Sequence, residues 1–242
     1  KDPAVYQSWY GVAHTSPELL PEAVFGLPEL NRTALPGARL VACPGCYPTA
    51  TTLAAFPALA AGVVSSSRVV VDAKSGVSGA GRTASSATHF VAVNESVAPY
   101  KVATHRHTPE IEQALSSVAG RAMSVVFAPH LVPMTRGLLS TVYLEVDEGF
   151  SGSDAIELYR SRYADEPFVT VCPAGVMPST AEVRGTNRAV VGVTVDERTR
   201  TLIVACAIDN LVKGAAGQAI QCANAVMGFP ETEGLRFLQP VF

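Results

Sequence analysis

Charged residues are scarce in this chain of 242 residues, and their scarcity removes several classes of function. Asp, Glu, Lys and Arg make up 16% of the residues, the formal net charge is −3, and Lys and Arg nowhere form a run. Proteins that hold nucleic acid by its phosphates need clustered positive charge, so we expect no nucleic-acid partner. Apolar runs fall well short of the roughly 18 residues of a membrane span, so we expect no membrane partner.

The chain also lacks an initiator methionine and a charged-then-apolar leader, and it opens at Lys1 like the middle of a longer protein. Its five cysteines form an odd set without a secretory context, so we expect a reduced, cytoplasmic protein. Only Cys43 and Cys46 form a close pair. Because structural zinc needs about four ligands, we expect no metal site.

Turn-forming Pro and Gly fill residues 1–37, which we expect to be irregular with short helical pieces. Hydrophobic patterning then predicts more strands than helices, in mixed order. This favours an α+β fold built on a mixed β-sheet. Strands are expected at residues 39–42, 68–73, 125–128, 138–146, 190–195 and 202–208, the last two as a hairpin, and helices at 48–61, 108–118, 154–164 and 211–227.

The last predicted helix carries apolar residues at helical spacing. Gly214 and Gly217 leave one side of this helix without side chains, which predicts close approach of a neighbouring backbone. The apolar positions are Leu211, Val212, Ala215, Ala216, Ala219, Ile220, Ala223 and Val226.

Cys46 lies in a tight connection between a predicted buried strand and a predicted helix. A helix N-terminus presents unpaired N–H groups and partial positive charge, which favour the reactive thiolate. The interpretation is that Cys46 is a nucleophile; the alternative is a small apolar core residue. Its spacing from Cys43 also permits a redox dithiol.

Two imidazoles and a guanidinium precede the helix expected from Thr108. A cysteine nucleophile commonly works with a histidine acid/base. In an extended segment His105 and His107 point to one side and Arg106 to the other, so geometry alone does not choose between the histidines. The alternative is a surface cluster that caps the helix.

Residues 75–82 form a loop with three glycines, two hydroxyls and a closing arginine. Successive N–H groups on such a turn can bind an anion, and Arg82 could clamp a phosphate or carboxylate. The loop matches neither a P-loop nor a dinucleotide fingerprint. We expect anion binding here and a turn with a salt bridge at Arg136.

These motifs together resemble the N-acetyl-γ-glutamyl-phosphate reductase family, which is related to aspartate-semialdehyde dehydrogenases. The matching segments are residues 44–49, 75–82, 105–111, 136–137 and 209–216. The resemblance implies a catalytic Cys46 and an acid/base His105, with no such role for Cys43. It further implies substrate contacts from Ser75, Gly76, Arg82, Arg106 and His107, and cofactor contacts from Gly45, Ser78, Gly79 and Asn210.

The implied activity is NADPH-dependent reduction of N-acetyl-glutamyl 5-phosphate to its semialdehyde through a cysteine thioester, in arginine biosynthesis. The partners would be NADP(H), the acyl phosphate and inorganic phosphate, in a homodimer or homotetramer. The family also implies that residues 1–45 complete a Rossmann-like NADP-binding domain whose phosphate loop is absent. Residues 46–208 would be the catalytic and dimerisation domain, and residues 209–242 a helix returning to the nucleotide domain.

Three other functions stay open on sequence. The first is reduction of a related acyl phosphate, aminoadipyl or aspartyl phosphate. The second is a dithiol oxidoreductase that uses Cys43 and Cys46. The third is an inactive fragment that only assembles.

Overall fold

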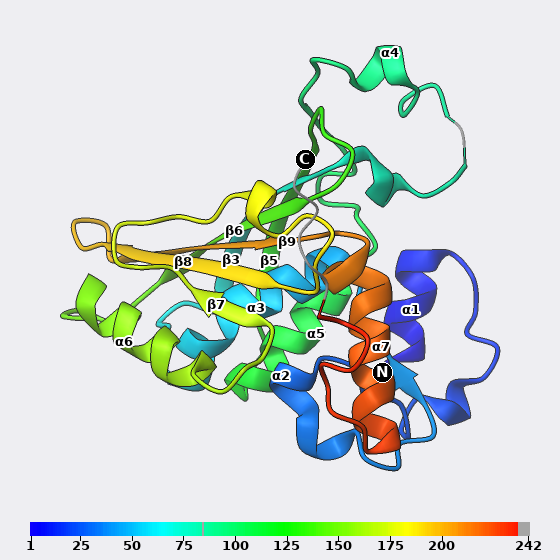
Figure 1. Ribbon diagram of the computed structural model, residues 1–242, viewed down its shortest axis with the longest axis horizontal. Helices are drawn as coiled ribbons and strands as arrows, with labels where there is room; N and C mark the ends of the chain where they lie inside the picture. Colours follow the sequence, from blue (N-terminus) through cyan, green and yellow to red (C-terminus); the bar gives the residue numbers. More distant parts are fainter. Residues whose placement is uncertain (84, 237–242) are drawn as a thin grey trace.

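The computed structural model describes residues 1–83 and 85–236, which form one large sheet, one small sheet and seven α-helices (Figure 1). The strands are β1 (Val24–Phe25), β2 (Val41–Ala42), β3 (Arg68–Ser75), β4 (Ala98–Pro99), β5 (Ser124–Leu131), β6 (Leu138–Glu145), β7 (Val169–Val171), β8 (Ala189–Asp196) and β9 (Thr201–Ile208). The helices are α1 (Pro3–Tyr10), α2 (Pro28–Asn31), α3 (Cys46–Ala60), α4 (Phe90–Val93), α5 (Thr108–Ala119), α6 (Gly152–Tyr163) and α7 (Gly217–Met227). None of the described helices is long and apolar enough to cross a membrane.

The large sheet is mixed, with seven strands in the order β4-β5-β3-β6-β9-β8-β7. The pairs β3–β5 and β7–β8 are parallel, and the remaining pairs are antiparallel. The β8–β9 hairpin turns through Arg200, which has a positive φ. This mixed sheet with helices confirms the α+β fold and the predicted hairpin.

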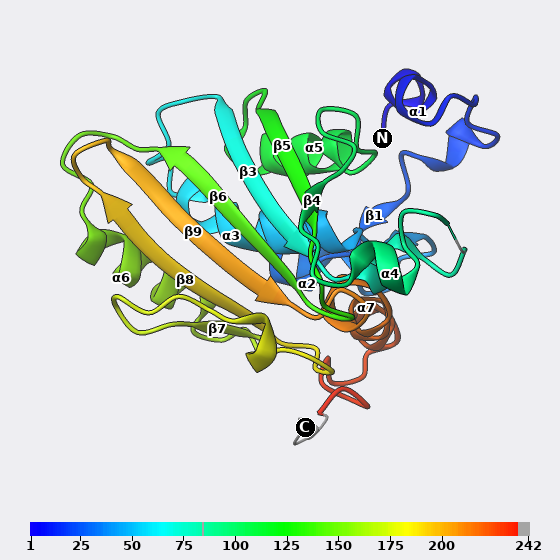
Figure 2. The same cartoon turned by 90° about the horizontal axis from the view of Figure 1, so that it is seen from above.

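Helices α3, α5 and α6 lie together along one face of the large sheet, as Figures 1 and 2 show from two sides. Strand residues alternate accordingly: Val69, Val71 and Ala73 of β3 point into this layer and are fully buried. Helix α3 is buried nearly all round, as an apolar helix must be at the centre of a core. Its central place fixes where its N-terminal residue, Cys46, can lie.

The small sheet is a parallel pair, β1 with β2, that stands apart from the large sheet. Helix α7 packs beside it and against α2. A fully buried ion pair joins these segments, with the Lys213 ammonium 2.6 Å from the Glu29 carboxylate. Lys213 also donates to the Gln221 side chain at 2.7 Å. The first and last parts of the described chain therefore pack together.

Two predicted elements differ from what the structure shows. The strand expected at residues 39–42 is only Val41–Ala42, it pairs with β1 alone among the described residues, and Ala42 is exposed rather than buried. The helix expected at 211–227 begins as a π-helix, Val212–Ala216, before α7. Its predicted apolar face is largely exposed, as at Ile220. The side chains buried there instead include Lys213, Gln218 and Gln221.

The proposed division at residues 45 and 208 stays a prediction. Residues 237–242 of its third part lie outside the described residues.

Candidate active site

Cys46 is the first residue of α3, and Gly45 is its N-cap. The backbone N–H groups of Cys46 and Tyr47 face the Cys46 sulfur and lower its pKa, as a helix N-terminus should. Burial acts more strongly in the other direction, and the Glu110 carboxylate adds to it, so the pKa of Cys46 is raised to about 11. The expected thiolate is therefore not the resting form: Cys46 rests as a thiol.

His105 and His107 lie side by side just before α5, with ring centroids 4.8 Å apart. Arg106 lies over the Tyr10 ring at 5.3 Å. The segment is a turn rather than extended, with His107 in the right-handed helical conformation, yet the two histidine rings still lie together. Nδ1 of His105 accepts the His107 backbone N–H at 3.1 Å. This contact assigns the proton of a neutral His105 to Nε2.

The His107 ring lies directly against Gly45. A Cβ placed on Gly45 would overlap the Nε2 atom of His107, so only glycine fits before Cys46. Nδ1 of His107 is buried without a hydrogen-bond partner among the described residues. The imidazole therefore lies against the backbone that leads into the candidate nucleophile.

Both histidines are held neutral. Burial lowers the pKa of each to about 4, and nearby positive charges such as Arg106 contribute less. At neutral pH the two rings therefore carry no net charge beside Cys46.

Glu110 belongs to this site, although its pattern in the sequence indicated only a helix start. Its Oε1 accepts the Gly45 backbone N–H at 3.1 Å. Burial raises the pKa of Glu110 to about 7, and the Gly45 hydrogen bond opposes this shift. The carboxyl group therefore exchanges a proton near neutral pH, and it is hydrogen-bonded to the residue that precedes Cys46. The sequence feature that could have indicated this role is the position of Glu110 three residues after His107.

Tyr47 and Tyr100, which the sequence analysis did not single out, form an aromatic wall beside His105. The Tyr100 hydroxyl donates to the Tyr47 hydroxyl at 2.9 Å. The Tyr47 ring meets His105 edge-on at 5.5 Å and Phe127 at 5.1 Å. These rings hold the histidine pair in a fixed, mostly apolar pocket.

Gly214, in the π-helix, packs against Cys46 from the other side. A Cβ on Gly214 would lie 2.6 Å from Cβ of Cys46. The predicted close approach of a neighbouring backbone is therefore confirmed at Gly214, whereas Gly217 is approached by the side chain of Asn187. π-Turns often mark functional sites, and here the turn lets the chain approach Cys46.

The glycine loop does not form the predicted anion nest. The N–H groups of Gly76, Val77 and Ser78 donate to the backbone carbonyls of Gly137, Met134 and Thr135 at 2.8–3.1 Å. They are therefore occupied, because residues 134–137 lie against the loop.

The loop contributes hydrogen-bonding side chains instead of free N–H groups. Nδ2 of Asn210 donates to the Ser78 hydroxyl at 2.9 Å, and Oδ1 of Asn210 accepts the Gly137 N–H at 2.8 Å. A Cβ on Gly79 would lie 3.0 Å from the Ser75 hydroxyl. The structure thus brings together Ser75, Ser78, Gly79 and Asn210 of the predicted site.

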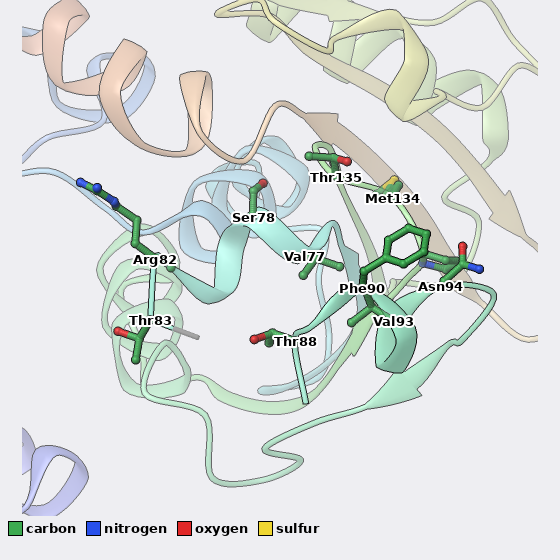
Figure 3. A pocket seen from close by; sticks show the side chains of 12 residues that line it. Val77, Ser78, Arg82, Thr83, Thr88, Phe90, Val93, Asn94, Met134 and Thr135 are labelled. Atoms are coloured by element: carbon green, nitrogen blue, oxygen red, sulfur yellow. The ribbon is translucent and has the colours of Figure 1, made fainter. Parts of the chain in front are cut away.

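Arg82 and Arg106 lie outside this cluster. Arg82 is on the wall of a cavity of about 470 Å³ between the glycine loop and the segment around Phe90. Its side chain extends away from Phe90 and Thr88 (Figure 3). Arg106 borders a different cavity, between α1 and α5. Arg136, as predicted, forms a salt bridge, at 3.0 Å to Asp209.

Cys43 contacts Cys222 rather than Cys46: a hydrogen bond from the Cys222 thiol lowers the pKa of Cys43 to about 7. Within residues 1–83 and 85–236, no group of three or more His, Cys, Asp and Glu side chains is placed to hold a metal ion.

Comparisons with known proteins identify relatives of this chain. Residues 46–210 match the family described as semialdehyde dehydrogenase, dimerisation domain. The N-acetyl-gamma-glutamyl-phosphate reductase of Symbiobacterium thermophilum is 54% identical over 243 residues, which cover 100% of this chain and 70% of that protein. The enzyme of the same name from Rhodospirillum rubrum is 52% identical over 241 residues, covering 100% and 68%.

Solved structures support the fold. Aspartate semialdehyde dehydrogenase II from Vibrio cholerae, complexed with ASA, superposes with a TM-score of 0.69 over 86% of this chain and 69% of that one. A probable aspartate-semialdehyde dehydrogenase from Pseudomonas aeruginosa gives a TM-score of 0.66 over 84% and 67%. Their identities are 18% and 15%, so the likeness concerns the fold alone.

Proposed function

Because this chain belongs to the N-acetyl-γ-glutamyl-phosphate reductase family, we propose that it carries the catalytic part of an enzyme that reduces N-acetyl-glutamyl 5-phosphate to the 5-semialdehyde. The reaction releases inorganic phosphate and serves arginine biosynthesis. One observation supports this most directly: Cys46 lies at a helix start, enclosed by His107 on Gly45, by Glu110 and by Gly214. A thiol beside a carboxyl group that can accept its proton near neutral pH suits acyl transfer.

The first step is attack by the Cys46 sulfur on the acyl carbon, which expels phosphate and leaves a thioester. Cys46 begins as a thiol, so its proton must leave first. Glu110 is the neighbouring group whose pKa of about 7 lets it take that proton near neutral pH. N–H groups at the start of α3 would stabilise the developing oxyanion, a contribution typically worth about 3 kcal/mol.

The second half of the reaction returns the thiol. The reducing hydride comes from NADPH when the cofactor is bound. His105 carries its proton on Nε2 and is placed among aromatic rings, so it can donate this proton to the oxygen of the thiohemiacetal and recover it as that species collapses. The semialdehyde then leaves and Cys46 is restored.

The cofactor and substrate residues divide between two parts of the site. The cluster of Ser78, Gly79 and Asn210 is ordered by its own hydrogen bonds and suits one end of NADP(H), and Gly45 is assigned a further cofactor contact next to Cys46. Binding of the pyrophosphate would need a glycine-rich dinucleotide loop. Substrate contacts are assigned to Ser75, Gly76, His107, Arg82 and Arg106. The two arginines are exposed, so they would bind the charged groups of the substrate at its outer end.

We further propose that the protein assembles through its dimerisation domain as a homodimer or homotetramer. Residues 1–45 and 209–242 would belong to the nucleotide-binding half. Its five free cysteines suit the reducing cytoplasm.

Replacement of the nucleophile tests the proposal. In a protein that joins this chain to the N-terminal segment of its relatives, Cys46→Ser should abolish phosphate-dependent oxidation of N-acetyl-glutamate semialdehyde, because a hydroxyl is a far weaker nucleophile than a thiolate. Cys172→Ser is the matched control and should leave the rate near wild type. Activity of Cys46→Ser within tenfold of wild type would overturn the assignment. Aspartyl and aminoadipyl semialdehydes, assayed as alternative substrates, test which acyl group the enzyme accepts.

A further inference from the structure

Cys43 and Cys222 form a pair of thiols that the proposed reaction does not use. Cys43 follows β2 directly and is exposed, whereas Cys222 lies in α7 and is 1% exposed. The two are 179 positions apart in sequence, yet both sulfurs approach the same residue, Gly26. A Cβ on Gly26 would lie 3.1 Å from the Cys43 sulfur and 3.2 Å from the Cys222 sulfur.

Hydrogen bonds hold the buried partner in this arrangement. The Cys222 thiol has two acceptors within reach, the Gly26 carbonyl oxygen at 3.1 Å and the Cys43 sulfur. The Gly26 N–H in turn donates to the Ala42 carbonyl at 2.9 Å, which fixes the end of β2 beside α7. The two thiols therefore face each other across a gap where glycine leaves room.

We propose that Cys43 and Cys222 are a thiol-oxidation site, in which a hydroperoxide oxidises Cys43 and Cys222 resolves the product to a disulfide. This site is separate from the reductase reaction and does not depend on it.

Each step balances in atoms and electrons. The Cys43 thiolate attacks one peroxide oxygen, so an S–O bond forms, the O–O bond breaks, and the other oxygen leaves as water after gaining a proton. The Cys222 sulfur then attacks the Cys43 sulfur. The S–O bond breaks, and its oxygen leaves as water with the Cys222 proton. Two thiols and one hydrogen peroxide give one disulfide and two waters.

The two sulfurs differ in the way that these roles require. The hydrogen bond from Cys222 lowers the pKa of Cys43 to about 7, while the same contact and burial raise the pKa of Cys222. Cys43 is also exposed to solvent, whereas Cys46 is half-buried and burial raises the pKa of its thiol. Cys43 therefore reacts first, and Cys46 is spared.

The test is peroxide titration of the purified, reduced chain at pH 7, followed by blocking with N-ethylmaleimide and non-reducing tryptic mass spectrometry. We expect two thiols lost per peroxide and a cross-link between peptides 40–68 and 214–236, reversed by dithiothreitol. Cys43 and Cys46 share the first peptide, so fragment ions must assign the linked sulfur. A cross-link through Cys46, or oxidation of Cys46 ahead of Cys43, would overturn the proposal.

Variants separate the two roles. Cys43→Ser should slow thiol loss about tenfold, whereas the matched control Cys172→Ser should not. Cys222→Ala should leave Cys43 trapped as a sulfenic acid that dimedone labels, since its resolving partner is gone. An unchanged rate in Cys43→Ser, or a disulfide that persists in Cys222→Ala, contradicts the assignment. Because the wild-type cross-link is measured independently, a variant that misfolds does not decide the outcome.

Discussion

At the scale of single residues, the active site depends on neutral groups brought close together. Burial keeps Cys46 a thiol and both histidines unprotonated, so the resting site has little charge apart from Glu110. Such a site avoids the desolvation penalty of a buried ion pair. Proton transfer then has to accompany the chemistry.

The two histidines should respond differently to the same substitution. His105→Asn should lower turnover by roughly 10²–10⁴-fold, the usual effect of losing a general acid or base. His107→Asn should cost less turnover and more stability, because its ring packs on Gly45. Steady-state kinetics and thermal unfolding of both variants check this. A larger turnover defect in His107→Asn would reverse the two roles.

Glu110 should make stability depend on pH in a direction unusual for a carboxylate. Its folded pKa of about 7 exceeds the ordinary 4.5, so between these values the folded state binds a proton that the unfolded state has lost. Stability is therefore lost as pH rises from 4.5 to 7, by on the order of 3 kcal/mol, and is level above that. Glu110→Gln should remove this dependence. Chemical denaturation of both proteins across pH 4.5–8 gives the difference, and parallel curves would contradict it.

At the scale of elements, regular patterns in the sequence were sufficient to predict most of the large sheet. The long strands β3, β5, β6, β8 and β9 begin within one residue of their predicted starts, because each carries a continuous β-branched or alternating apolar run. The two- and three-residue strands β4 and β7 were missed, since so short a segment has no readable period.

The site was predicted less completely, for a different reason. Cys46 and the histidines stand in motifs with local chemical meaning. Glu110 and Tyr100 act through contacts that cross between α3, α5 and a loop, and no local pattern reports those. The anion nest failed likewise, because the carbonyls that occupy its N–H groups come from residues 134–137.

The close packing of the π-helix against Cys46 can be tested at this scale. Gly214→Ala would place a methyl 2.6 Å from Cβ of Cys46, and the backbone there has little freedom to move. We expect a loss of about 1–3 kcal/mol of stability, together with lower turnover. Gly152→Ala is the control, because a Cβ at Gly152 meets nothing within 4 Å. Equal effects of the two substitutions in denaturation and kinetics would refute the tight fit.

At the scale of the whole molecule, α7 and the π-helix turn polar side chains inward and apolar ones outward. Lys213, Gln218 and Gln221 are fully buried, whereas Ile220 and Met227 are 44% and 70% exposed. Ion pairing and hydrogen bonds hold most of this buried stripe, although the Gln218 Oε1 atom is buried without a hydrogen-bond partner among the described residues. The outer face is an apolar surface with nothing packed on it in the described chain.

The chain alone should therefore fold but self-associate, because its exposed apolar face has no cover. It should bind NADPH weakly or not at all, since the sequence holds no glycine-rich dinucleotide loop. Size-exclusion chromatography and calorimetric titration measure the two properties. Joining the N-terminal segment of the relatives is the control and should restore binding. Low-micromolar binding by the chain alone would place the cofactor site within these residues.

The ion pair between Glu29 and Lys213 has a consequence for the order in which the protein is made. Its two members are 184 residues apart, so a ribosome releases Glu29 long before its partner exists. The large sheet between them also joins distant segments, since β3 pairs with β6 and β6 pairs with β9. The sheet can therefore be completed only after β9 has been made, and the small parallel pair likewise waits for α7. Cys46 is consequently translated well over a hundred residues before the π-helix that closes over it.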